Sequence, residues 1–181
     1  MKSLKRVFNV NDDLYTPPCL ARLVPLDTST RVLCPFDNEK SEFVKYYKEL
    51  GCVVEYGDLS TGDDFFKRDR PDVDVIISNP PFSQKLSVFE KLFTWGIPFA
   101  MLMNLMAINY QEIGELFANQ KQPPQLIIPD KKVSFNGKTS SFCSGFVTWK
   151  MFRYTLYKHL DNNNTGINFV PAEMFIDKGG K

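Results

Sequence analysis

The stretch VDVIISNPPFSQK, residues 73–85, indicates how this chain is built. Most of residues 73–78 are apolar, and the run predicts a buried strand. The residues that follow are Asn79, Pro80, Pro81 and Phe82. Proline has no N–H to donate to a neighbouring strand, so a sheet cannot continue through this motif. The predicted strand therefore ends on an amide, two prolines and an aromatic ring.

The rest of the chain alternates apolar runs with amphipathic segments. Strands are predicted over residues 31–36, 52–56, 73–78, 98–105, 125–128, 131–135 and 145–154. Helices are predicted over residues 16–24, 84–94 and 111–119, with a further helix that Ser41 caps and Gly51 ends. Thr16 is expected to cap the first helix. Strands separated by helices predict an α/β protein whose mostly parallel sheet has helices on both faces.

Composition excludes several classes of protein. The chain has 181 residues, 43% hydrophobic and 24% charged, which is typical of one globular domain. Its cysteines form no CxxC pair and its single histidine is His159, so neither a metal site nor a disulfide framework is expected. Reduced thiols favour a cytoplasmic protein. The longest apolar run, residues 97–108, is broken by Pro98 and Asn104, so no membrane-spanning segment is expected.

Charge is unevenly distributed along the chain. Residues 121–160 hold seven Lys or Arg and one acidic residue, whereas residues 1–120 hold 13 basic and 17 acidic residues. Such asymmetry is compatible with a nucleic-acid-binding face and with a solvated lysine-rich surface.

Ligands of parallel α/β sheets bind beyond the carboxyl ends of the strands, so the segments that follow the strands are candidates for the site. Three of them are unusual: residues 34–41 (CPFDNEKS), 57–66 (GDLSTGDDFF) and 78–82 (SNPPF). Each proline holds its predecessor extended, which makes the Asn79 carboxamide and the Pro80 carbonyl a rigid pair of acceptors. Two converging acceptors suit an exocyclic –NH2 group, and Phe82 offers a ring on which a base can stack. The structural alternative is a Pro-Pro turn followed by a core phenylalanine.

The NPPF sequence resembles the (D/N)PP(Y/F) motif of S-adenosylmethionine-dependent amino-methyltransferases, most closely the small Dam-like adenine-N6 DNA methyltransferases of phages. The resemblance implies a Rossmann-like methyltransferase fold with a C-terminal antiparallel hairpin. It also implies one domain, residues 1–181, without a separate target-recognition domain, with S-adenosylmethionine as cofactor and DNA as substrate. The catalytic residues would be Asn79, Pro80, Pro81 and Phe82.

Further motifs extend the resemblance to the cofactor site. The residues implied to bind the cofactor are Tyr15, Thr16, Pro35, Phe36, Asp37, Ser41, Asp58, Asp64 and Phe65. Asp58 would bind the ribose hydroxyls, with Glu55 as an alternative, and Asp64 and Phe65 would hold the adenine. The segment 34–41 has no glycine, unlike the glycine-rich first motif of most methyltransferases. Asp37, or the amides at the start of the helix after Ser41, are expected to replace the missing contacts to the methionine end.

The late segment around residues 133–137 resembles the aromatic motif that completes the base sandwich. Phe135 is therefore expected to stack on the target base together with Phe82. Lys131, Lys132 and Lys138 flank this ring and are expected to contact phosphates. Alternatives are methylation of RNA bases or of protein glutamine. A catalytically silent nucleic-acid-binding member of the fold is a further alternative.

Overall fold

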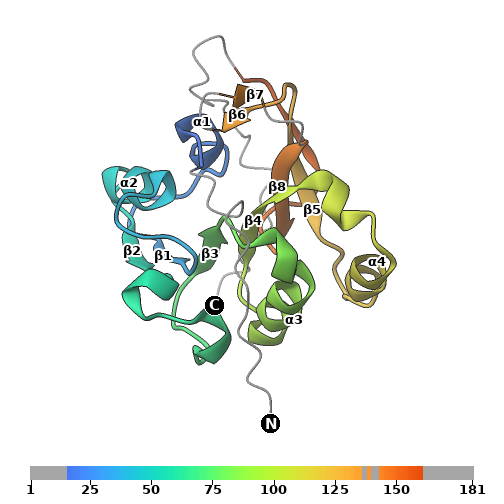
Figure 1. Ribbon diagram of the computed structural model, residues 1–181, viewed down its shortest axis with the longest axis horizontal. Helices are drawn as coiled ribbons and strands as arrows, with labels where there is room; N and C mark the ends of the chain where they lie inside the picture. The colour runs from blue at the N-terminus through green and yellow to red at the C-terminus, as the bar shows by residue number, and fades with distance from the viewer. Residues whose placement is uncertain (1–15, 136–137, 140–142, 161–181) are drawn as a thin grey trace.

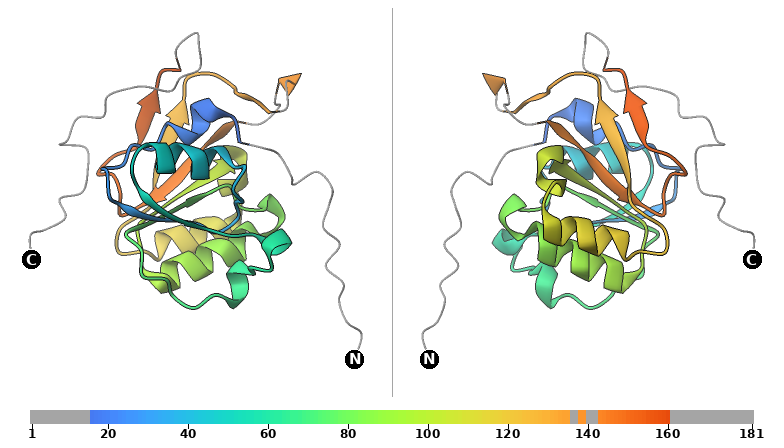
Figure 2. Two further views of the ribbon diagram at one scale, coloured as in Figure 1. Left: turned by 90° about the vertical axis from the view of Figure 1, so that its left-hand side faces the viewer. Right: turned by 90° about the vertical axis from the view of Figure 1, so that its right-hand side faces the viewer.

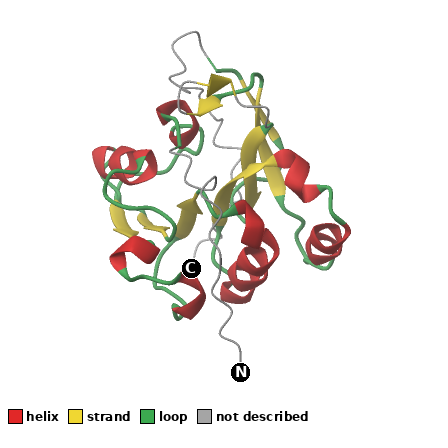
Figure 3. Cartoon of the chain, in the orientation of Figure 1, coloured by secondary structure: helices red, strands yellow, loops and turns green. Residues whose placement is uncertain are grey.

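The computed structural model describes residues 16–135, 138–139 and 143–160 (Figure 1). Within these residues the main sheet has seven strands in the order β2-β1-β3-β4-β8-β5-β9, and β6 pairs with β7 in a separate sheet (Figure 3). The strands are β1 (Arg31–Cys34), β2 (Val53–Tyr56), β3 (Val75–Ser78), β4 (Phe99–Asn104), β5 (Gln125–Pro129), β6 (Ser134–Phe135), β7 (Lys138–Thr139), β8 (Ser144–Trp149) and β9 (Leu156–Lys158).

Strand direction determines which segments share an edge of the sheet. Strands β2, β1, β3 and β4 pair in parallel, and β9 is parallel to β5. Strand β8 runs antiparallel between β4 and β5. The carboxyl ends of β1 to β5 and of β9 therefore lie at one edge. The Rossmann-like α/β fold predicted from the sequence, with a mostly parallel sheet, is confirmed. Where the sequence predicted a C-terminal antiparallel hairpin, β8 pairs antiparallel with β5.

Helices cover both faces of the sheet (Figure 2). They are α1 (Pro18–Ala21), α2 (Glu42–Glu49), α3 (Lys85–Trp95) and α4 (Gln111–Ala118). Residues of α1 and α2 form a hydrophobic cluster on one face, and residues of α3 and α4 form a second cluster on the other. Ile76 and Ile77 of β3 point into different clusters, and both are 0% exposed. Burial on both faces explains why this strand is apolar without alternation.

Helix α2 begins and ends where the sequence predicted. Ser41 accepts a hydrogen bond from the backbone N–H of Phe43 at 3.2 Å, and Gly51 follows the helix in the left-handed region with φ 88°. The expectation for Thr16 was wrong, because the N-cap of α1 is Pro17 and no side chain caps it. Pro18 keeps Pro17 extended, so the helix cannot begin earlier.

Two further differences have a local cause. The strand predicted over residues 145–154 ends at Trp149, because Lys150 has φ 56° and its left-handed backbone breaks the strand. The chain then returns as β9, a three-residue edge strand that was not predicted. The described residues also form four short 3-10 helices: η1 (Leu59–Thr61), η2 (Phe65–Lys67), η3 (Phe82–Gln84) and η4 (Leu105–Ile108).

Candidate active site

The carboxyl edge of the sheet carries the segments that follow β1, β2 and β3. Because these strands are parallel, all three segments leave the sheet at the same edge. An isolated bridge joins Asp37 to Gly57, and the Nδ2 atom of Asn38 donates to Oδ2 of Asp58 at 3.1 Å. The segments after β1 and β2 are therefore held against each other.

Asp37 is a buried carboxyl at this edge. It accepts hydrogen bonds from the hydroxyl of Ser41 at 2.5 Å, from the hydroxyl of Ser78 and from the backbone N–H of Asn79. The Ser78 hydroxyl in turn accepts from the backbone N–H of Phe36 at 3.2 Å. Burial raises the pKa of Asp37 to about 6, although the hydrogen bonds from Ser41 and Ser78 act in the opposite direction. One carboxyl thus joins the segment after β1, the start of α2 and the end of β3.

The NPPF motif follows β3 directly. Pro80 is buried, while Asn79, Pro81 and Phe82 are partly exposed. Pro81 is extended, with φ −62° and ψ 121°, and the chain turns only at Phe82, where η3 begins. The two prolines thus hold Asn79 and Pro80 in an extended segment at the sheet edge.

Gln84, the last residue of η3, is a candidate that sequence reasoning missed. Its Oε1 atom is buried, and within the described part of the chain nothing donates a hydrogen bond to it. Leaving a buried acceptor unsatisfied costs roughly 1–3 kcal/mol. The atom is therefore suited to accept a hydrogen bond from a bound group. Its only sequence signal is its place just after the NPPF motif.

Asp58 follows β2 and caps η1. Its Oδ1 atom accepts from the backbone N–H groups of Ser60 at 2.9 Å and Thr61 at 3.1 Å. Partial burial opposes ionisation, but hydrogen bonds led by the one from Ser60 outweigh it and lower the pKa of Asp58. Asp58 is thus an ionised acceptor at the sheet edge. Glu55, the alternative for the same role, lies within β2 and forms an ion pair with Arg68.

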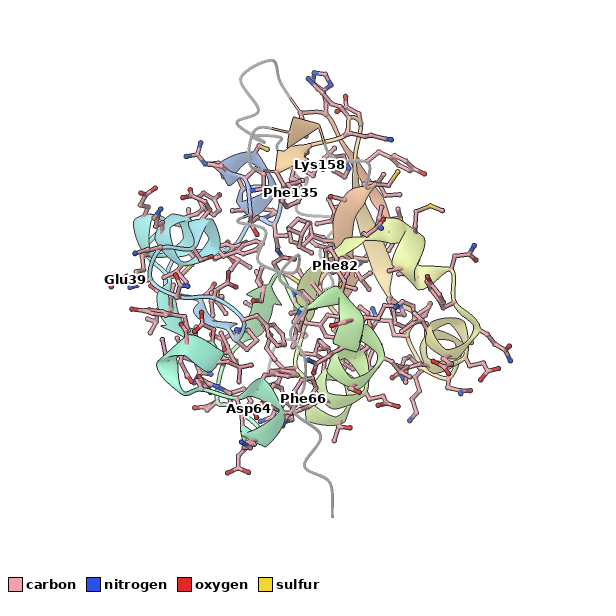
Figure 4. All side chains as sticks on the ribbon, in the orientation of Figure 1. Glu39, Asp64, Phe66, Phe82, Phe135 and Lys158 are labelled. Atoms are coloured by element: carbon pink, nitrogen blue, oxygen red, sulfur yellow. The ribbon has the colours of Figure 1, made fainter. Side chains whose placement is uncertain are left out.

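A cluster of aromatic rings lies beside the segment after β2. Phe65 is 2% exposed, and its ring centroid lies 4.7 Å from that of Phe36, 5.2 Å from that of Phe66 and 5.1 Å from that of Trp95. Asp64 caps η2 by accepting from the backbone N–H of Phe66 at 3.0 Å (Figure 4). Phe36 and Phe66 keep part of their surface exposed, whereas Phe65 is enclosed.

Figure 4 labels the two rings predicted to hold a base, Phe82 and Phe135. They belong to different hydrophobic clusters. Phe135 in β6 is 7% exposed and lies in the cluster of α1 and α2. Phe82 packs against the cluster of α3 and α4 on the other face. That both rings stack on one base stays a prediction.

The basic stretch is divided between two edges of the sheet. Lys131 and Lys132 are exposed and follow β5, at the same edge as Asn79. Lys150 follows the antiparallel strand β8 and donates to the carbonyl oxygen of Gly96, just before β4, at 3.3 Å. It therefore lies at the opposite edge.

The structure describes the remaining predicted site residues only in part. Tyr15 lies outside the described residues, and so does the side chain of Lys138. Thr16 is buried just before α1, and Pro35 is buried just after β1.

Lys158 is a buried cation that sequence reasoning missed. It is 6% exposed at the end of β9, two residues from both Leu156 and Leu160, which are buried in the cluster of α1 and α2. Burial lowers the pKa of Lys158. The alternation of these three residues was its sequence signal. His159 next to it is exposed and forms a hydrogen bond with Asp130.

The described residues also bear on metal binding and membrane insertion. There, no group of three or more His, Cys, Asp or Glu residues is arranged to hold a metal ion. Cys19, Cys34, Cys52 and Cys143 do not form disulfides. No helix in these parts of the chain combines the length and the apolar character needed to cross a membrane.

Comparison with known proteins points to methyltransferases. No protein-family model matches the chain. The chain is similar to the type II methyltransferase M.EcoRI of Escherichia coli, with 28% identity over 88 residues that cover 44% of this chain and 27% of that enzyme. A solved structure of a predicted O-methyltransferase from Agrobacterium tumefaciens overlaps 78% of this chain and 84% of its own, with a TM-score of 0.44 and 14% identity. The similarity to M.EcoRI, in a chain with a Rossmann-like sheet, supports a protein of the methyltransferase class.

Proposed function

We propose that this protein is an S-adenosylmethionine-dependent methyltransferase that acts on adenine N6 in DNA. The observation that carries the proposal is the position of Asn79 and Pro80 at the carboxyl end of β3, beside the segments that follow β1 and β2. Similarity to a type II methyltransferase supports the same class of reaction.

Residues at this edge fit the polar parts of the cofactor. The ionised carboxylate of Asp58 is an acceptor suited to ribose hydroxyls. The backbone N–H groups at the start of α2, behind Ser41, suit the methionine carboxylate. Bound S-adenosylmethionine would supply an electrophilic methyl group.

The adenine of the cofactor is assigned to the aromatic surface after β2. Asp64 would accept a hydrogen bond from its amino group, as the resemblance implies. Phe65 is enclosed, so we assign it to support, and we assign direct ring contact to the partly exposed Phe36 and Phe66. This proposal moves the stacking surface from Phe65 to the two rings that pack on it, Phe36 and Phe66.

Asn79 and Pro80 are the residues proposed to act on the target amine. The side-chain carboxamide oxygen of Asn79 and the backbone carbonyl oxygen of Pro80 would each accept one hydrogen of the –NH2 group. This would draw the nitrogen lone pair out of conjugation with the base. Phe82 would supply the stacking face. Placement of the amine supplies much of the rate, so these residues need no separate general base. The proton leaves to solvent after the N–C bond forms.

The DNA backbone is assigned to the edge that carries Lys131 and Lys132, because cations there can contact phosphates next to the reacting base. Phe135 lies in the segment that follows and would support this surface. We propose that residues 1–181 hold one methyltransferase domain, in which loops at this edge would contact the target. We propose that the protein acts in the cytoplasm, where thiols stay reduced, because its cysteines do not form disulfides.

The proposal is tested by calorimetric titration with S-adenosylmethionine and its demethylated product, followed by transfer of radiolabelled methyl groups to DNA, RNA and protein. Micromolar binding with N6-methyladenine as the labelled product supports it. Label in RNA bases or in protein glutamine would indicate that RNA or protein, rather than DNA, is the substrate. If the folded protein binds no cofactor, the proposed methyltransferase activity is contradicted. This result would favour the silent nucleic-acid-binding alternative, to which the glycine-free segment 34–41 points.

A further inference from the structure

A single carboxyl connects the proposed catalytic residue to the proposed cofactor segment. Asp37 accepts from Ser41 through Oδ1 and from Ser78 through Oδ2, and it also accepts from the backbone N–H of Asn79. Phe36 donates its backbone N–H to the same Ser78 hydroxyl. Asp37 is 7% exposed, so water competes little for these contacts.

We infer that Asp37 is a positioning residue that fixes Asn79 against the segment after β1, so that target amine and methyl donor are held at a set distance. Its catalytic consequence rests on the proposed function. Segment 34–41 contains no glycine, so its backbone is not shaped by a glycine turn. The hydrogen bonds of Asp37 hold it instead.

Positioning accounts for the surroundings of Asp37 better than direct contact with the cofactor does. Its two oxygens already accept from Ser41, Ser78 and Asn79. An ammonium group from the cofactor would have to enter a buried position around which these three donors are already placed. The contact to the methionine end expected from the sequence is therefore assigned to the start of α2.

The titratable groups around Asp37 show that it acts through hydrogen bonds. They are Cys34 on β1, Tyr47 on α2 and Asp58 after β2. None of these three is a cation, so none forms an ion pair with the carboxylate. Protonation of Asp37 would turn one acceptor into a donor and weaken the link to one of its partners.

Asp74 provides a matched control at the other end of the same two strands. Its carboxylate accepts from the backbone N–H of Arg31 at 2.9 Å and from its guanidinium at 3.0 Å. It therefore also bridges β1 and β3, but at their amino ends. Replacing Asp37 or Asp74 by Asn removes one charge and keeps the shape of the side chain.

The experiment compares Asp37→Asn and Asp74→Asn with the unaltered protein. Amide hydrogen exchange and single-turnover methyl transfer are measured, with labelled S-adenosylmethionine and genomic DNA that lacks adenine methylation. We expect Asp37→Asn to speed exchange at the amides of Phe36 and Asn79. It should slow transfer by about 10- to 100-fold, because a misplacement of about 1 Å can cost about 100-fold. Cofactor affinity should stay close to normal, and Asp74→Asn should change neither the exchange at these amides nor the rate.

The pH profile supplies a readout that a purely structural role would not affect. The single-turnover rate of the unaltered protein should change near pH 6, where Asp37 titrates, and this change should be absent in Asp37→Asn. If Asp37→Asn does not fold, Ser78→Ala is used in its place, because it removes only the hydroxyl that donates to Asp37. The same faster exchange at Asn79 is expected.

The outcomes separate the inference from the proposed function. Normal exchange at Asn79 and a normal rate in Asp37→Asn would overturn the inference and leave the methyltransferase in place. Faster exchange at Asn79 only in Asp37→Asn, with no transfer by the unaltered protein, would support the positional link and overturn the proposed function.

Discussion

The Nδ2 atom of Asn38 donates a 3.1 Å hydrogen bond to Oδ2 of Asp58, so the segment after β1 orients the carboxylate that follows β2. Ser60 and Thr61 donate their backbone N–H groups to Oδ1. The hydroxyl of Ser60 also donates to Oδ1. Each carboxylate oxygen offers about two acceptor sites. Oδ2 therefore keeps capacity for a further donor such as a ribose hydroxyl.

Asp58→Ala should weaken S-adenosylmethionine binding by about 10- to 100-fold, because hydrogen bonds to a charged acceptor contribute about 1.5–3 kcal/mol. Calorimetric titration measures the change. Glu55→Ala is the control, since Glu55 lies within β2 and its carboxylate is paired with Arg68. The reverse result would assign the ribose to Glu55.

Asn79→Ala should slow single-turnover methyl transfer by about 100-fold or more and leave cofactor affinity nearly intact. Loss of one hydrogen-bonding group that acts in the transition state typically costs about 100- to 1000-fold. Asn119→Ala, at the exposed end of α4, is the matched control. Full activity of Asn79→Ala would rule out the mechanism.

The double variant Lys131→Ala/Lys132→Ala should weaken DNA binding and reduce the slope of log affinity against log salt by about two, because each lost phosphate contact removes about 0.9. Fluorescence anisotropy at several salt concentrations measures both. Lys121→Ala/Lys150→Ala removes the same charge from the opposite edge and should leave the slope unchanged. Equal effects of the two pairs would indicate nonspecific attraction.

As pH rises from 4 to 6, the contribution of Asp37 to the free energy of unfolding should fall. Its folded pKa is about 6 against an ordinary value of 3.8. A folded pKa above the unfolded one means that the contribution is present at low pH and is lost as pH rises through this window. The loss is about 3 kcal/mol, at about 1.4 kcal/mol per pH unit. Urea unfolding should show it relative to Asp37→Asn, and parallel pH curves would contradict it.

Two glycine substitutions should change stability in opposite directions. Gly114 lies in α4, and a Cβ there would meet nothing within 4 Å, so Gly114→Ala should stabilise by about 0.5–1 kcal/mol. A Cβ at Gly145 in β8 would lie 2.6 Å from the carbonyl oxygen of Ile127, so Gly145→Ala should destabilise by about 1–3 kcal/mol. Urea midpoints measure both. A neutral Gly145→Ala would mean that β8 and β5 pack less closely than the structure shows.

Local signals were sufficient for the elements that build the site. The cap at Ser41, the stop at Gly51 and the apolar run that ends at Asn79 depend on hydrogen bonds and backbone preferences within a few residues. The α/β class follows from the order of such signals. The end of β8 was predicted less well, because the left-handed φ of Lys150 ends this strand and no residue type at that position signals it. The chain then leads to β9.

Only the tertiary structure decided which side chains meet at the carboxyl edge. Ser78 reaches Asp37 from 41 positions away, although no local pattern links the two. The antiparallel direction of β8 divides the basic stretch between two edges, and Phe82 and Phe135 lie in different hydrophobic clusters. These relationships depend on strand order and direction. Strand order and direction arise from contacts between residues far apart in the chain, so the local periodicity of the sequence does not contain them.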